Sequence, residues 1–317
     1  GWSDPTGSAR ASGGAPLVSA LQGDHLYLSE IDQALGEIRQ QTGLDRFEVI
    51  GMDACLMSQL EVYTALQPHA RYAVASEETE PALGWAYTGF LQALVDNPEM
   101  SGEELVSSVV QTYIDDDQRI VDRQARADFL RQNSPLGGFF GVSDVSPDQL
   151  TRQIVRDTTL SAVDLEALPS LMQAFNTFAY RLQDVDQAAI ASARSYAQSY
   201  TNVFGKDVPN AYIDLGHFAE LAARQANNGA LTEAANAVNK AVREMVVAEK
   251  HGPGKPGSTG IALYFPNSTM YRSPYTGPQS YNDLAGRFPQ ASLWDDFLAY
   301  HYSDPPFNQG AGEPVAP

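Results

Sequence analysis

The chain has 317 residues, 43% of them hydrophobic, which is enough for one large domain or two of medium size. Its 20 basic and 39 acidic residues give a formal net charge of −19. Nucleic acid and anionic membranes are therefore poor partners, because both bind clustered lysine and arginine. No stretch approaches ~20 consecutive apolar residues, so no transmembrane helix is predicted. The single cysteine excludes an internal disulfide and a structural cysteine-type zinc site.

The first part of the chain alternates between helix and strand patterns. In chain order we expect a helix at residues 29–42, a strand at 47–52, a helix at 56–66 and a strand at 72–75. Ser29 is a good N-cap for the first helix, Asp32 stands at the capping-box position, and Gly43 closes the C-terminus. The strand at 47–52 is apolar enough to be buried on both faces. This order predicts an α/β fold with a parallel sheet and helical crossovers.

The rest of the chain is richer in helical patterns. These cover residues 102–113, much of 115–132, 169–181, 187–196, 231–250 and 293–302. Strand patterns cover residues 139–142, 160–163 and 260–266. The first residue is not methionine, and residues 304–317 are rich in Pro and Gly. We therefore expect a piece of a longer or processed protein that ends in a tail or linker.

Cys55 stands where the strand at 47–52 gives way to the helix predicted from residue 56. Ligands gather at the carboxyl ends of strands in open α/β sheets. A thiol at the start of a helix is expected to have a lowered pKa, which a nucleophilic cysteine requires. The other interpretation is a small apolar residue at a strand end, which is common for a lone cysteine. Position alone leaves both open.

Asp53 lies two residues before Cys55, so both side chains point the same way if the strand alternation continues. A carboxylate beside a thiol raises the pKa of that thiol, which makes Asp53 a poor activator. It fits better as the receptor for a cationic group of a substrate. The alternative is that Asp53 only caps the following helix.

An acidic segment, SEETE at residues 76–80, follows the second predicted strand at the same sheet edge. Its carboxylates are Glu77, Glu78 and Glu80, which could add to a binding pocket for a cation or form an ordinary solvated loop. Trp85, with Tyr87 after it, could wall a substrate cleft or pack in the core. The sequence alone does not choose between these roles.

Several sequence blocks together resemble the clostripain family of cysteine peptidases, which has a caspase-like fold. The two specific blocks are FEVIGMDACL at 47–56 and VASEETEPALGWAY at 74–87, with LEV at 60–62 between them. Weaker blocks continue the resemblance along the chain: TLSAVDL at 159–165, YIDLGHFA at 212–219, GIALYFP at 260–266 and LWDDFLAYHY at 293–302.

This resemblance implies an α/β caspase-like sandwich, with a mostly parallel central sheet, helices on both faces and a largely helical C-terminal half. Residues 1–150 would be the catalytic core without its N-terminal part, 151–303 the C-terminal part of the same peptidase unit, and 304–317 the tail. It also implies a secreted or cell-envelope bacterial protein that is often matured by self-cleavage. No cofactor is required for the chemistry, and calcium is possible.

For the site, the resemblance implies that Cys55 is the nucleophile of an endopeptidase that cleaves peptides and proteins after Arg or Lys. Asp53 matches the family position that binds this basic side chain, and the backbone amide of Cys55 would form half of the oxyanion hole. The other residues expected to bind substrate are those of the acidic segment and the aromatic after it: Glu77, Glu78, Glu80 and Trp85.

The family's general base is a histidine followed by glycines and a tryptophan. Gly1 and Trp2 look like the end of that block, so the histidine is expected just upstream of residue 1. A surface or packing role is favoured for each of the five histidines present, which are His25, His69, His217, His251 and His301. This chain alone is therefore expected to be inactive, and its own cleaved N-terminal fragment is a possible partner.

Two other functions stay open. The chain could be a catalytically incomplete caspase-like scaffold that binds partners or regulates, or it could perform another thiol chemistry such as acyl transfer. Arg10, in the flexible stretch GSARASGGAP at 7–16, is a candidate for self-cleavage, although it could equally be an ordinary linker residue. Asp115, Asp116 and Asp117 are candidate calcium ligands, but three adjacent helical side chains point in different directions and cannot all reach one ion; Glu77, Glu78 and Glu80 are equally open candidates.

Overall fold

The structure is a computed structural model that describes residues 26–81, 84–132, 146–201 and 210–303. Its strands are β1 (Phe47–Met52), β2 (Ala70–Ala75), β3 (Thr159–Asp164), β4 (Tyr212–Asp214), β5 (Val246–His251) and β6 (Ala262–Tyr264). The helices of the first half are α2 (Leu28–Thr42), α3 (Leu60–Leu66), α4 (Tyr87–Asp96), α5 (Gly102–Thr112), α6 (Gln118–Val121), α7 (Arg123–Gln132) and α9 (Pro147–Asp157). Those of the second half are α10 (Leu168–Arg181), η3 (Leu182–Asp184), α11 (Gln187–Tyr196), α12 (Leu215–Ala226), α13 (Gly229–Met245), α14 (Ser268–Arg272), α15 (Pro278–Leu284), α16 (Phe288–Ala291) and α17 (Trp294–Ser303).

The central sheet has the strand order β1-β2-β3-β5 in the described part of the chain. Strands β1 and β2 are parallel, with Met52 opposite Ala75, and α3 is the crossover between them. The pairs β2·β3 and β3·β5 are antiparallel. The expectation of a mostly parallel sheet is therefore wrong for these residues. The cause is that β3 starts at the edge where β2 ends, with Ala75 opposite Ser161, instead of returning through a crossover to the other edge.

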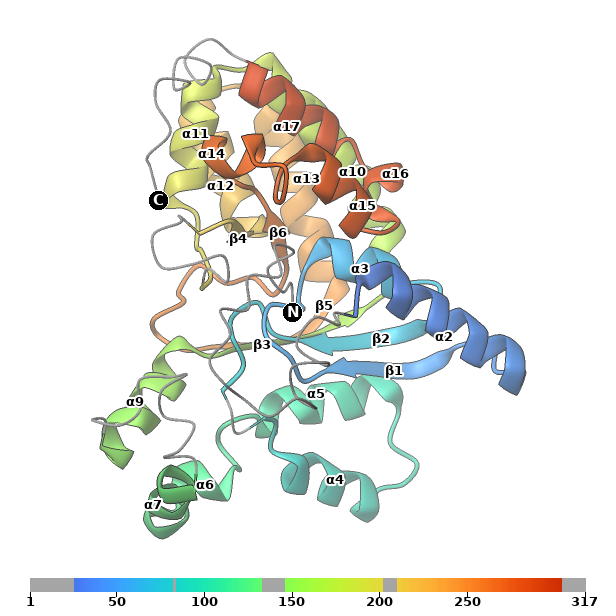
Figure 1. Ribbon diagram of the computed structural model, residues 1–317, viewed down its shortest axis with the longest axis vertical. Helices are drawn as coiled ribbons and strands as arrows, with labels where there is room; N and C mark the ends of the chain where they lie inside the picture. Colours follow the sequence, from blue (N-terminus) through green and yellow to red (C-terminus); the bar gives the residue numbers. More distant parts are fainter. Residues whose placement is uncertain (1–25, 82–83, 133–145, 202–209, 304–317) are drawn as a thin grey trace, which may run out of the picture.

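Helices cover both faces of the sheet (Figure 1). On one face α4 and α5 pack on a small core that contains Tyr72, Val74 and Leu160. The other face carries α3 and the helices of the C-terminal half. Ala73 and Ala75 of β2 belong to the larger hydrophobic core on this face. Alternate residues of β2 thus enter different cores, which explains why the strand is apolar throughout.

Most helix and strand predictions are confirmed to within a few residues. The clearest error is the single helix expected at 231–250, which ends as α13 at Met245 and continues directly as β5. Two consecutive β-branched residues, Val246 and Val247, favour the change to a strand. The strand expected at 260–266 is shortened to β6, which pairs with β4 in a second small sheet. The strand expected at 139–142 lies outside the described residues.

The first helix ends as predicted, with Gly43 in the left-handed conformation at φ 71°. It starts differently, because Tyr27 and not Ser29 is the N-cap and Glu30 reaches back to the Tyr27 amide. Asp32 instead accepts hydrogen bonds from Arg287 and contacts His69 Nε2 at 2.6 Å. Within the described residues, no helix is both long and apolar enough to span a membrane.

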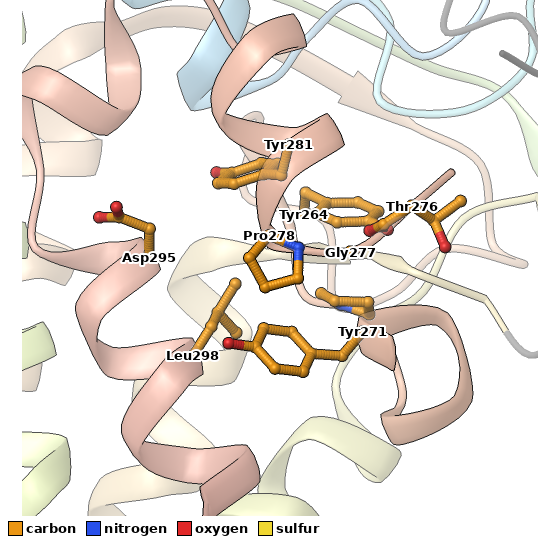
Figure 2. Close-up of a pocket in the computed structure, with 9 residues that line it drawn as sticks. Tyr264, Tyr271, Thr276, Gly277, Pro278, Tyr281, Asp295 and Leu298 are labelled. Carbon is orange, nitrogen blue, oxygen red and sulfur yellow. Dashed lines mark hydrogen bonds between the residues drawn. The ribbon is translucent and has the colours of Figure 1, made fainter. Parts of the chain in front are cut away.

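Glu61 joins the first half of the chain to the C-terminal half. Its side chain is completely buried on α3, and Oε1 accepts hydrogen bonds from the Tyr264 amide at 3.1 Å and the Tyr281 hydroxyl at 2.8 Å. Figure 2 shows these two tyrosines, whose rings are stacked at 5.3 Å beside a small hollow between α15 and α17. Oε2 of Glu61 has no hydrogen-bond partner in the described structure, so burial raises the pKa of this carboxyl to about 7.

The pKa of Glu61 predicts a loss of stability with rising pH. Between about pH 4.5 and pH 7 the unfolded chain releases this proton while the folded chain keeps it, so the free energy of unfolding falls as pH rises. Glu61→Gln removes the titration, and the difference in unfolding free energy between pH 5 and pH 7.5 should shrink by about 2–3 kcal/mol. Urea unfolding at both pH values measures it. Glu233→Gln, at an exposed position of α13, is the control, and an unchanged pH dependence in Glu61→Gln would contradict this role.

Candidate active site

Cys55 lies in the segment that connects β1 to α3. The helix begins at Leu60, so the expectation that it starts at residue 56 with the thiol at its N-terminus is wrong. The intervening turn uses Leu56, which has the uncommon φ of 57°, donates its amide to the Glu78 carbonyl at 3.1 Å and is fully buried. The buried Leu56 fixes the turn and leaves the neighbouring Cys55 partly exposed.

The thiol is held by one residue of the acidic segment. Sγ of Cys55 accepts a hydrogen bond from the Glu80 amide at 3.3 Å and lies 3.9 Å from the Glu80 carbonyl. Burial raises the pKa of the Cys55 thiol and the Glu80 amide opposes this effect, while the carboxyl of Glu80 adds to it. The expected lowering of the pKa by a helix is therefore wrong, and the thiol needs a base to become a thiolate at neutral pH.

Asp53, two residues before Cys55 in the same segment, presents an exposed carboxylate. Its Oδ2 accepts hydrogen bonds from the Trp85 amide at 3.3 Å and the Tyr87 hydroxyl at 3.0 Å. Gly84, at φ 67°, permits this approach, because a Cβ there would lie 2.7 Å from Oδ2. In the described part of the chain, no hydrogen bond reaches Oδ1 and no Lys or Arg pairs with Asp53. The carboxylate can accept a cation from outside.

Glu80 does not face solvent, which corrects its expected role as a direct substrate contact. Its side chain is 8% exposed, and its oxygens accept hydrogen bonds from Trp85 Nε1 at 3.2 Å and from the Tyr113 hydroxyl. Burial raises the pKa of Glu80 to about 8. Trp85 is also buried and packs on Gly51 of β1, so Tyr87, which is 49% exposed, is the aromatic at the surface.

Glu78 is paired inside the protein and not free for a substrate. Its Oε2 lies 2.5 Å from Nζ of Lys255, and its carboxylate accepts the Thr201 amide at 3.1 Å. Lys255 comes from the Gly- and Pro-rich segment before β6, and its ammonium also lies 5.3 Å from the centre of the Tyr200 ring. Sequence reasoning missed this pair, because the two residues are far apart in the chain.

Glu77 is 1% exposed and packs against Asp214, so it too is structural and not a substrate contact. Asp214 is the partner with more hydrogen-bond donors, because its buried carboxylate accepts the amides of His217 and Thr259, both at 2.6 Å. Burial and the charge of Asp214 raise the pKa of Glu77, so Glu77 holds the proton of the pair. The aspartate is part of the YIDLGHFA block, but its partner could not be identified from sequence.

The described histidines are engaged elsewhere, as predicted for surface or packing residues. His69 contacts Asp32, His251 contacts Glu249 at 2.8 Å, and His301 contacts Gln187 at 2.7 Å. Nδ1 of His217 accepts the Gln198 amide at 3.0 Å. His25 and Arg10 lie outside the described residues. Within the described ranges, no hydrogen bond joins a histidine to Cys55, and no group of three or more His, Cys, Asp or Glu is arranged to hold a metal ion.

The fold and the site define an α/β protein that presents a partly exposed thiol and an exposed carboxylate from one segment at one edge of its sheet. The clostripain family profile, of C11 peptidases, matches residues 19–301. The chain therefore belongs to the clostripain family, and its fold is the caspase-like fold of C11 proteases.

Three solved structures are similar to this chain. An inactive zymogen C11 protease from Parabacteroides distasonis is 15% identical over 90% of this chain and 66% of its own, with a TM-score of 0.52. A secreted C11 cysteine protease from Bacteroides thetaiotaomicron, bound to an irreversible peptide inhibitor, is 16% identical over 85% of this chain and 63% of its own, also at 0.52. This chain thus spans slightly less than two thirds of these two proteins. A B. fragilis cysteine protease is 16% identical over 90% of this chain and 99% of its own, at 0.47. Among curated proteins none matches.

The internal role of Glu78 predicts that its lysine partner is needed for stability. Lys255→Met leaves a carboxylate that is 3% exposed without its cation and should lower the free energy of unfolding by about 3–5 kcal/mol. Adding Glu78→Gln should recover part of this loss. Urea unfolding measures both variants, and Lys240→Met, which breaks an exposed pair with Glu244, should cost below about 1 kcal/mol. Equal losses in the two lysine variants would contradict this assignment.

Proposed function

We propose that this protein is a cysteine endopeptidase that cleaves peptide bonds after Arg or Lys, with Cys55 as the nucleophile. The observation that carries the proposal is that partly exposed Cys55 and exposed Asp53 lie two residues apart, in the segment that leaves the sheet at the edge where parallel strands end. Membership of the clostripain family supports the thiol chemistry, and the cysteine proteases among the solved relatives agree with it.

In the proposed reaction, the Cys55 thiolate attacks the carbonyl carbon of the scissile bond. The oxyanion that forms is stabilised by the backbone amide of Cys55, and the amine leaves with a proton to give an acyl-enzyme that water hydrolyses. Because the pKa of the thiol is raised, ionisation at neutral pH depends on a general base. We assign this role to a histidine, which the resemblance to the family leads us to expect upstream of Gly1.

Asp53 supplies the specificity in this proposal. The Trp85 amide and the Tyr87 hydroxyl both bond Oδ2, which leaves Oδ1 to accept a guanidinium or ammonium group. Substrate would displace water from this carboxylate, and an ion pair shielded from water is stronger than one at the surface. Glu77, Glu78 and Glu80 are buried, so they add no free carboxylate to the pocket.

The second candidate is a catalytically incomplete caspase-like scaffold that binds partners. The observation in its favour is that the described histidines contact groups other than Cys55. A fluorogenic assay of the full-length protein with an arginyl substrate distinguishes the two functions. Hydrolysis that disappears in Cys55→Ala supports the peptidase, whereas binding of peptides without hydrolysis supports the scaffold.

We also propose that the protein is secreted and matured by self-cleavage. A secreted relative and a zymogen relative among the solved C11 proteases support these two parts of the proposal. Arg10, in a stretch of small residues, has the basic side chain that the proposed specificity requires.

The role of Asp53 predicts a selective loss of activity on basic substrates. Asp53→Asn keeps the size of the side chain and removes its charge, so kcat/KM for a P1-Arg peptide should fall about 100-fold, which corresponds to about 2.7 kcal/mol. Steady-state kinetics of full-length protein with P1-Arg and P1-Leu peptides measure this. The P1-Leu rate and the exposed control Asp283→Asn should change little. An equal loss on both peptides would sink the assignment of specificity to Asp53.

Self-cleavage at Arg10 predicts a new N-terminus at Ala11. Mass spectrometry of the expressed full-length protein should find this terminus in the wild type and not in Cys55→Ala or Arg10→Gln. Active enzyme with an intact bond between Arg10 and Ala11 would exclude this site.

A further inference from the structure

We propose that Glu80 is a positioning residue for Cys55, whose buried side chain holds the peptide unit that contacts the sulfur. The inference deepens the proposed function, because it names the residue that sets the geometry and charge around the nucleophile. It assigns Glu80 a role different from that of Asp53, which binds substrate.

The contact between Glu80 and the sulfur is made by the main chain. The amide donates to Sγ at 3.3 Å and the carbonyl lies 3.9 Å from the same atom, so both polar groups of one residue face the thiol. A donor to sulfur favours the thiolate and fixes the rotamer of Cys55. Movement of this one residue would therefore change both the orientation and the ionisation of the nucleophile.

The side chain of Glu80 is held by two hydrogen bonds, one from Trp85 and one from Tyr113, which we call the clamp. Trp85 Nε1 donates to Oε1, and the Trp85 ring packs so closely on Gly51 of β1 that a Cβ there would lie 2.8 Å from the ring. The Tyr113 hydroxyl donates to Oε2, and Tyr113 is the buried C-cap of α5. These two hydrogen bonds connect Glu80 to strand β1 through Trp85 and to helix α5 through Tyr113.

Burial of the Glu80 carboxyl also keeps the surroundings of the thiol less negative, although the hydrogen bonds from Tyr113 and Trp85 act in the opposite direction. Burial raises the pKa of Glu80 to about 8, so the carboxyl is mostly neutral at pH 7. The titratable groups whose charges interact with it are Cys55, Asp53, Tyr87 and Tyr113. As pH rises through about 8, Glu80 ionises and its charge opposes thiolate formation at Cys55, so the two titrations are coupled.

Alkylation of Cys55 by iodoacetamide tests the charge effect without any need for peptidase activity. In full-length protein, Cys55 labelling is followed by peptide mass spectrometry between pH 6.5 and pH 10. Glu80→Gln keeps the size of the side chain and removes the ionisation, so labelling near pH 9 should rise several-fold over wild type and change less than about twofold at pH 6.5. Glu99→Gln, in an exposed turn, should follow the wild-type profile.

Steady-state kinetics test the positioning. Glu80→Ala should lower kcat on a P1-Arg peptide about 10- to 100-fold with little change in KM, because Asp53 is intact. Tyr113→Phe keeps the ring but removes one clamp bond, and it should lower kcat at least about threefold even if Glu80→Ala fails to fold. Wild-type kcat in Tyr113→Phe, or a Glu80→Gln labelling profile identical to wild type, would overturn the proposal. If the protein has no peptidase activity, the labelling profiles still decide the inference.

Discussion

The parallel pairing of β1 and β2 is the constraint on which the site depends. It aligns Met52 with Ala75, so the segments that follow the two strands leave the sheet side by side. Cys55 and Asp53 come from the first segment and Glu80 from the second, and the hydrogen bond from the Glu80 amide to Sγ joins them. Two backbone hydrogen bonds, from the Leu56 amide to the Glu78 carbonyl and from the Ser58 amide to the Ser76 carbonyl, also join these segments, which run in opposite directions there. The position of the nucleophile is thus a consequence of strand register.

Four carboxyl groups near this edge have four different environments, although the protein as a whole is strongly acidic. Asp53 is exposed and forms no ion pair with a Lys or Arg of the described residues, whereas Glu78 forms an ion pair with Lys255. Glu77 and Glu80 are buried with raised pKa values, so they carry little charge at neutral pH. Of these four carboxyls, burial and pairing thus leave only Asp53 free and charged, which fits the proposed selection of a cation and limits repulsion of the thiolate.

Sequence patterns predicted most helices and strands and the place of Cys55, because apolar periodicity and strand ends are local features. The same patterns could not separate the roles of Glu77, Glu78 and Glu80, which depend on partners from distant segments: Asp214, Lys255 and Tyr113. They also placed the start of α3 too early, since nothing local marks Leu56 as a residue with positive φ. The antiparallel orientation of β3 and β5 could not be predicted either, because it depends on long connections between the strands.

The C-terminal half is needed to build this edge. Thr159 of β3 accepts the amides of Glu77 and Glu78 through its hydroxyl, and its strand pairs with β5 from the same half. Lys255 supplies the cation that pairs with buried Glu78, and Asp214 lies against Glu77 and favours the protonated form of that carboxyl. The acidic segment is therefore fixed by residues of both halves, so a fragment that ends near residue 150 would keep Trp85 and Tyr113 but lack the groups that hold Glu77 and Glu78. The nucleophile and its support form one cooperative unit, because removing either half leaves buried carboxyls without partners.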